Sequence, residues 1–166
     1  MIVENRFPNP FVPTAVEFWE DRLKLGYKIT AVSGSDDKLG PGLGSSATAV
    51  YADELSRAAL KDAIRAGHAY LRTLGVDESP TLELLATTSD GQSGMFGDTL
   101  HADSAEVTVT VRGGDGQTIR IYRDGALSGT VPIVGNDFSH AFTATRDESS
   151  GPLGTFYRVE TFNGSV

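Results

Sequence analysis

The spacing of apolar residues along the chain changes near residue 80. Before that point, segments with helical periodicity alternate with short apolar runs, and after it apolar and polar residues alternate one by one. Helical spacing is typical of an amphipathic helix, and strict alternation is typical of a strand with one buried face. The sequence therefore predicts mixed helices and strands in the first half and an antiparallel β structure in the second.

One helix is predicted near the start of the chain, over Ala15–Leu25. Thr14 and Glu17 form a capping box, in which the Thr14 hydroxyl accepts a backbone amide bond and Glu17 reaches back. Gly26 supplies the stop that usually follows a helix. The prolines between Arg6 and Pro13 predict an extended loop before this helix.

Strands are predicted at Lys28–Ser33 and Thr48–Tyr51, where short apolar runs lie between loop residues. Ser56 is expected to cap a helix that ends at Gly67. An extended segment at His68–Arg72 follows. With a short apolar run at residues 2–4, the first half predicts the order β, α, β, β, α, β, which is typical of an α/β fold.

Strict alternation marks several strands in the second half. They are expected near residues 81–84, 107–112, 118–122, 138–145 and 155–161. Turn sequences separate them, including Asp124-Gly125. About seven short strands at this spacing predict an antiparallel, immunoglobulin-like β-sandwich.

The fold class that follows is α+β, with a boundary near residue 76. Residues 1–76 are expected to form a partial α/β segment, and residues 77–166 the β-sandwich domain. A complete parallel barrel takes roughly 200 residues or more, whereas the second half, with roughly 85 residues, is long enough for an immunoglobulin-like sandwich. We therefore expect the first domain to be part of a larger structure.

Composition narrows the classes of partner. The chain has a net charge of −8, which disfavours binding to a phosphate backbone, so no nucleic-acid partner is expected. No apolar run approaches 18 residues, so no membrane partner is expected. There is no cysteine, and the chain therefore has neither disulfides nor thiolate metal ligands.

The sharpest candidate for chemistry is the acidic pair Asp36 and Asp37, just past the predicted strand Lys28–Ser33. The carboxyl end of a buried strand is where α/β folds place functional groups, so a carboxylate there could bind a hard cation or position a water. The alternative is an Asx-type turn, in which one carboxylate caps loop amides and the other is solvated. Lys38 could neutralise an anionic substrate, replace a cation, or lie exposed in solvent.

Other chemical motifs are weak. The glycines of the segment LGPGLGSS (residues 39–46) precede no Walker-type lysine, and a flexible crossing between strands is the simpler interpretation. The histidines at positions 68, 101 and 140 have no metal-binding spacing, and no GxSxG motif is present. No catalytic residue is assigned.

Several segments nevertheless follow the order of one known family. They are Glu4-Asn5, Phe18 to Gly26, Ile29 to Asp36, Ala49 to Ala52, Leu55-Ser56, Ala63 to Gly67 and Tyr70-Leu71. In this order the chain resembles the end of a PHP-domain metallohydrolase (polymerase and histidinol phosphatase superfamily), in its CehA/McbA-like branch. The resemblance is close over residues 2–73 and extends to the β half by order and general pattern.

The resemblance implies a distorted (β/α) barrel that holds divalent metals (Zn, Mn or Fe) and cleaves phosphoesters with a metal-activated water. Asp36 matches the aspartate of the family's last Asp-x-His metal motif. Lys38 stands where that motif has histidine, and a protonated ammonium is no metal ligand.

Because the family's other ligands are missing, this chain alone is not expected to bind the metal tightly or to be active. Its partner would be a missing N-terminal barrel region, or the chain would self-associate. The alternative is a non-catalytic β-sandwich binding or scaffold module with a degenerate PHP remnant. We expect the chain to be the C-terminal fragment of such a hydrolase.

Overall fold

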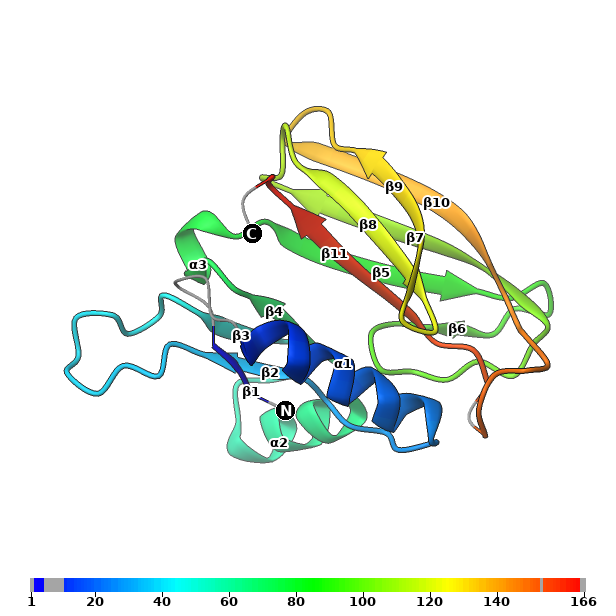
Figure 1. Ribbon diagram of the computed structural model, residues 1–166, viewed down its shortest axis with the longest axis horizontal. Coiled ribbons are helices and arrows are strands. Elements are labelled where there is room, and N and C mark those ends of the chain that lie inside the picture. The colour runs from blue at the N-terminus through cyan, green and yellow to red at the C-terminus, as the bar shows by residue number, and fades with distance from the viewer. Residues whose placement is uncertain (1, 5–10, 153, 165–166) are drawn as a thin grey trace. The chain divides into compact units, whose positions relative to one another are not determined.

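The computed structural model describes residues 2–4, 11–152 and 154–164, and it shows a mixed α+β fold with mostly antiparallel sheets (Figure 1). The chain forms two compact units. The first comprises Met1–Trp19, Lys28–Ser79 and Phe96–Asp98. The second comprises Glu20–Tyr27, Pro80–Met95 and Thr99–Val166. None of the helices among the described residues is long and apolar enough to span a membrane.

The first unit begins with a parallel strand pair. Strand β1 (Ile2–Glu4) pairs with β2 (Val32–Gly34), with Glu4 opposite Gly34, and helix α1 (Phe11–Lys24) lies between them in the chain. Parallel strands need a long crossover connection, and a helix is the usual one. The two strands therefore end side by side at their carboxyl ends.

Helix α1 begins four residues before the predicted start, so the capping box predicted at Thr14 and Glu17 was wrong, because Thr14 lies within the helix. The prediction of a loop through Pro13 was wrong at its end, because residues 11–13 are helical, while residues 6–10 lie outside the described part of the chain. Pro13 is the third residue of α1. Amides in the first turn of a helix have no intrahelical acceptor, so proline is tolerated there.

Strand β2 is shorter than the predicted segment Lys28–Ser33. Side-chain hydrogen bonds to carbonyl groups of distant residues hold the segment just before it. Trp19 Nε1 donates to the Ile29 carbonyl at 2.7 Å, and Thr30 Oγ1 donates to the Ile64 carbonyl at 2.5 Å. A ladder forms only where β1 runs alongside, at residues 32–34.

The rest of the first unit follows the prediction closely. Strands β3 (Ala47–Val50) and β4 (Ala69–Arg72) pair antiparallel, and helix α2 (Arg57–Ala66) connects them. Ser56 Oγ accepts the Ala59 amide at 3.1 Å, and Gly67 ends the helix in the left-handed region at φ 89°. The predicted order β, α, β, β, α, β is confirmed. A short helix that was not predicted, α3 (Gly75–Glu78), follows.

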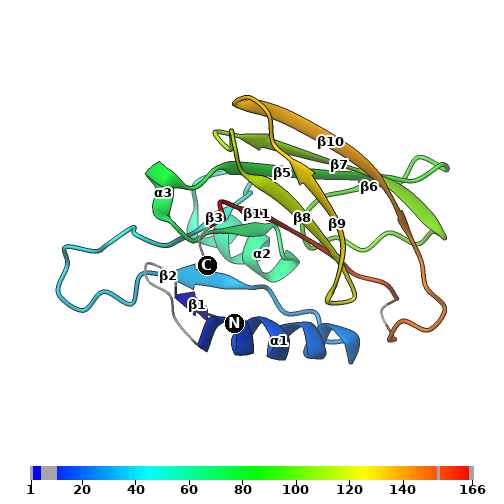
Figure 2. The same cartoon turned by 45° about the horizontal axis from the view of Figure 1, so that its top comes forward.

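The second unit contains two antiparallel sheets. The first has the order β10 (Asp137–Thr145), β7 (Ser104–Arg112), β5 (Thr81–Thr87), β6 (Ser93–Gly94), and the second has β11 (Tyr157–Phe162), β8 (Thr118–Arg123), β9 (Ala126–Pro132). Figure 2 shows the long strands of both sheets, which all belong to the second unit.

The core of the second unit is formed by strands in which buried apolar residues alternate with more exposed ones, as predicted. Its buried apolar side chains are Leu82, Val107, Val109, Val111, Ile119, Ile121 and Ile133. Leu82 belongs to β5, and Ile133 follows the end of β9. The other five occupy alternate positions of β7 and β8, so one face of each of these strands is buried. This arrangement is compatible with a β-sandwich. The structure does not show a barrel-like arrangement in the first unit, whose described sheets have two strands each.

An ion pair fixes the part of α1 that belongs to the second unit. Glu20 Oε1 accepts a bond from Arg158 Nε at 2.8 Å, and both side chains are largely buried. Arg158 also contacts Glu160 at 2.6 Å, and its guanidinium lies 3.8 Å from the ring centre of Tyr122. Burial of these charges is tolerated because each one is paired.

Candidate functional site

Asp36 lies two residues beyond the carboxyl end of β2. Its backbone has φ 48°, one of two positive values among the described non-glycine residues. Aspartate tolerates this region better than most residues, but it is still uncommon there. Because β1 runs parallel and ends level with Gly34, the segment that carries Asp36 leaves the sheet beside the end of β1.

The side chain of Asp36 is paired with a lysine. Lys38 Nζ lies 2.7 Å from Asp36 Oδ2, and the two side chains are 76% and 49% exposed. An exposed pair of this kind contributes between about 0 and 1 kcal/mol, because water screens both charges. The positive charge of the Lys38 ammonium therefore lies beside Asp36, where a metal ion bound to this carboxylate would also place its charge.

Asp37 organises the loop. Its Oδ1 accepts the amides of Leu39 at 2.7 Å and Gly40 at 3.0 Å, and its Oδ2 accepts the amide of Gly42. These amides, with that of Leu39 as the largest cause, hold the pKa of the Asp37 carboxyl below its usual value of 3.8, against a smaller opposing effect of desolvation. Asp37 is thus the carboxylate of the Asx-type turn.

The loop is also fixed at its base. Ser33 and Ser46 share a short hydroxyl–hydroxyl hydrogen bond, and Thr48 Oγ1 accepts the Ser33 amide at 2.7 Å. Gly75 packs so closely against Gly44 that an added Cβ would lie 2.5 Å from its carbonyl oxygen. The crossing between β2 and β3, seen as the extended loop in Figure 1, is therefore tied down at several points.

Each of the three histidines contacts residues other than Asp36. His68 Nε2 lies 2.9 Å from Asp98 Oδ1, the His101 amide donates to Gln92 Oε1 at 3.2 Å, and the His140 ring stacks near Phe142. Among the residues that the structure describes, no group of three or more histidine, aspartate and glutamate side chains could hold a metal ion. A metal at Asp36 would need ligands from outside these residues.

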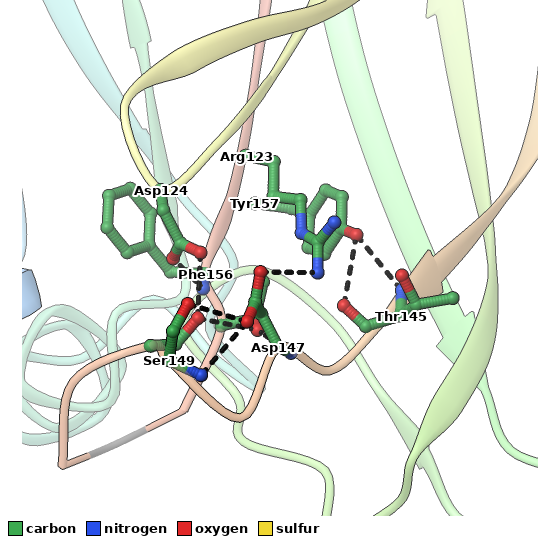
Figure 3. A network of polar contacts seen from close by, with 9 residues as sticks. Arg123, Asp124, Thr145, Asp147, Ser149, Phe156 and Tyr157 are labelled. Atoms are coloured by element: carbon green, nitrogen blue, oxygen red, sulfur yellow. Dashed lines mark hydrogen bonds and ion pairs between the residues drawn. The ribbon is translucent and has the colours of Figure 1, made fainter.

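A second polar cluster lies in the second unit, at the turn between β8 and β9 (Figure 3). Asp124 and Gly125 have φ of 49° and 84°, as a two-residue hairpin turn requires. Asp124 Oδ1 accepts the Phe156 amide at 3.0 Å, and its Oδ2 accepts the Ser150 hydroxyl at 2.8 Å. The turn is thereby bound to the segment between β10 and β11.

Asp147 extends this cluster. It accepts the Ser149 amide and hydroxyl at 2.9 and 2.7 Å, and Arg123 Nη2 lies 3.3 Å from its second oxygen (Figure 3). The hydrogen bonds from Ser149 are the main cause that lowers the pKa of Asp147 below 3.8. Neighbouring donors bind the carboxylates of Asp124 and Asp147. The cluster therefore stabilises the segment between β10 and β11.

Neither this cluster nor the Glu20–Arg158 pair can be predicted from the pattern of the sequence. The turn sequence Asp124-Gly125 was recognised, but the partners of Asp124 lie more than 25 residues away along the chain. Arg158 and Glu20 are 138 residues apart. Spacing along the chain contains no information about such contacts.

No family model, no curated protein and no solved structure matches this chain in comparisons with known proteins.

Proposed function

We propose that this chain is the closing part of a PHP-type, metal-dependent hydrolase of the phosphoesterase class, and that it contributes Asp36 as a metal ligand. The observation that supports this most is the β1–α1–β2 unit, in which parallel strands end together and Asp36 follows at once. Metal ligands of α/β enzymes project from such strand ends.

In this proposal the barrel-like arrangement is completed by a region outside the described residues, or by association with another copy. The divalent metal (Zn, Mn or Fe) would activate a water for attack on the phosphoester. Asp36 would hold one position on that metal. Lys38, 2.7 Å from Asp36, would neutralise negative charge on the substrate.

The second unit has a separate place in the proposal. Its two sheets would form an immunoglobulin-like β-sandwich, and residues 77–166 would be the domain attached to the barrel end. A β domain of this kind has its own buried core, which lies on β5, β7 and β8 in this chain. It would not need the metal in order to fold.

One observation favours a different function. The Asp36–Lys38 pair satisfies the carboxylate without a metal, as expected for a site that has lost its ligands. In that case the chain is a non-catalytic binding or scaffold module. Its β unit would then act through its loops, and Asp36 would only stabilise a turn.

The substitution Lys38→His tests the two functions. It removes the ammonium and restores the family's Asp-x-His motif, so we expect Zn²⁺ or Mn²⁺ to bind more tightly by about tenfold, or about 1.4 kcal/mol, in a calorimetric titration of the full chain. The matched control is Lys61→His, on an exposed position of α2 and away from the loop. The gain should disappear in the double variant that also has Asp36→Asn.

The alternative outcome is equally clear. If Lys38→His and Lys61→His bind the metal equally, Asp36 is not poised as a ligand and the binding-module function gains support. The circular dichroism spectrum of each variant shows whether the fold is retained, since the side chain of Lys38 is exposed and its loss should be tolerated.

A further inference from the structure

Strand β10 lies at one edge of its sheet. It pairs on one side with β7 over nine consecutive residue pairs, from Asp137 opposite Arg112 to Thr145 opposite Ser104, without a bulge. On its other side no strand is paired with it in the described part of the chain. It is a long, regular edge strand.

The hydrogen bonds to β7 show which residues of β10, the odd-numbered or the even-numbered, direct their backbone groups to the free edge. Asn136 accepts the Gly113 amide at 2.8 Å, and Arg146 donates to the Asp103 carbonyl at 2.8 Å, so the pairing with β7 continues past both ends of β10 at even-numbered residues. In an antiparallel pair, residues alternate between bonding the partner and pointing away from it. The odd-numbered residues of β10 therefore direct their N–H and C=O groups outward.

A side chain confirms this parity at one end. The Tyr157 hydroxyl accepts the Thr145 amide at 3.0 Å and donates to the Thr145 carbonyl at 3.2 Å, which places both groups of Thr145 on the side away from β7 (Figure 3). Tyr157 thus closes the edge at Thr145. Four residues remain with outward backbone groups: Asp137, Ser139, Ala141 and Thr143.

The open part of this edge, residues 137–143, lacks the sequence features that usually prevent strand pairing. Proteins blunt edge strands with lysine, proline, a bulge or a very short length. The sequence DFSHAFTAT contains neither lysine nor proline, and its one carboxylate, Asp137, is at the end. The open groups lie in a row of small side chains that would not obstruct a neighbouring strand.

We propose that β10 pairs antiparallel with β10 of a second copy of this chain, which joins the two sheets into one. The register centred on His140 uses every open residue: Asp137 lies opposite Thr143 of the other copy, and Ser139 lies opposite Ala141. No carboxylate then faces another carboxylate. The same register sets Phe138 opposite Phe142, an aromatic pair of the kind that stabilises adjacent strands.

A second copy fits better than an unrelated extended segment because the edge is complementary to itself. A twofold contact needs one patch that matches its own image, and this register provides that match at each open position. Tyr157 limits the pairing to the same four residues in both copies. The contact therefore has a defined length and ends at Thr145.

Amide exchange measured residue by residue tests the proposal at two protein concentrations. We expect the even-numbered amides of β10 to be protected at both, because β7 binds them. The amides of residues 137, 139, 141 and 143 should exchange more than about tenfold more slowly at the high concentration, where sedimentation should show a dimer. A chain that stays monomeric, or a dimer whose odd-numbered amides exchange as in the monomer, would overturn the proposal.

A variant pair gives a second test. Ala141→Pro removes an outward N–H and no bond to β7, and proline is accepted on edge strands in that orientation. It should abolish the dimer, whereas the control Ala141→Val, which keeps the N–H, should retain it. A dimer that persists in Ala141→Pro overturns the proposal, as does a monomeric chain whose odd-numbered amides are protected only by an added extended peptide.

Discussion

The substitution Glu20→Ala should destabilise the second unit far more than its place on a helix suggests. The Glu20 and Arg158 side chains are only 10% and 17% exposed, and Glu20 Oε1 lies 2.8 Å from Arg158 Nε. Alanine is the best helix former, so α1 itself loses nothing by the change. The cost comes instead from the Arg158 guanidinium, which stays buried without the carboxylate that neutralises its charge.

The size of the destabilisation depends on which partners of Arg158 remain after Glu20 is replaced. Removing one partner of a buried pair costs about 3–5 kcal/mol when the remaining charge is left alone. Here Glu160 stays 2.6 Å from Arg158, and the Tyr122 ring lies under the guanidinium. We therefore expect a smaller loss of unfolding free energy, at or just below the lower end of that range, about 2–3 kcal/mol. In a double-mutant cycle, Glu20→Ala with Arg158→Met should cost less than the sum of the two single changes.

The neighbouring residue provides the control. Asp21 pairs with Lys24 at 3.3 Å, but these side chains are 59% and 46% exposed, so Asp21→Ala should cost no more than about 0.5 kcal/mol. Urea unfolding followed by far-ultraviolet circular dichroism measures both. The transition of the second unit is the one that shifts in Ile119→Val, since Ile119 is fully buried there. Equal midpoints for Glu20→Ala and Asp21→Ala would refute the reasoning.

Two further predictions concern the first unit. Asp37→Asn should lower the stability of the protein at neutral pH and leave it unchanged in strong acid. The pKa of the Asp37 carboxyl is lower in the folded protein than its unfolded value of 3.8, so the ionised carboxylate stabilises the fold above pH 3.8. This contribution is lost as the pH falls through the folded pKa. Unfolding midpoints of both proteins across this range measure it, and a pH-independent difference would contradict the role of the amide of Leu39. Gly67→Ala should destabilise by at least about 1–3 kcal/mol, because φ is 89° and an added Cβ would lie 2.8 Å from Gly97 Cα. Gly44→Ala has a similar φ of 83° and open space around the Cβ, so it should cost less, and equal costs would show that the close approach is relaxed.

The order of elements could be predicted from the sequence because it depends on local physics. Ser56 and Gly67 cap α2 through bonds to neighbouring residues, and the alternation in β7 and β8 follows from one buried face per sheet. The start of α1 was missed because proline in a first turn is compatible with both loop and helix.

The outcome at the candidate site is similar. The pair Asp36 and Asp37 was located from its position after a strand, and the turn interpretation allowed one carboxylate to cap amides. Only the structure assigns that carboxylate to Asp37, since the choice depends on which side chain points into the loop. The metal role of Asp36 and the substrate role of Lys38 stay predictions.

The sequence by itself determined several local elements of this protein: the caps of α2, the hairpin turn at Asp124-Gly125 and the buried face of β7 and of β8. The tertiary structure alone decided the contacts between distant residues, such as Glu20 with Arg158 and Tyr157 with Thr145. The physical reason is that propensity and periodicity act within a few residues. Ion pairs and strand edges depend instead on which segments meet after folding, and that depends on the packing of the whole unit.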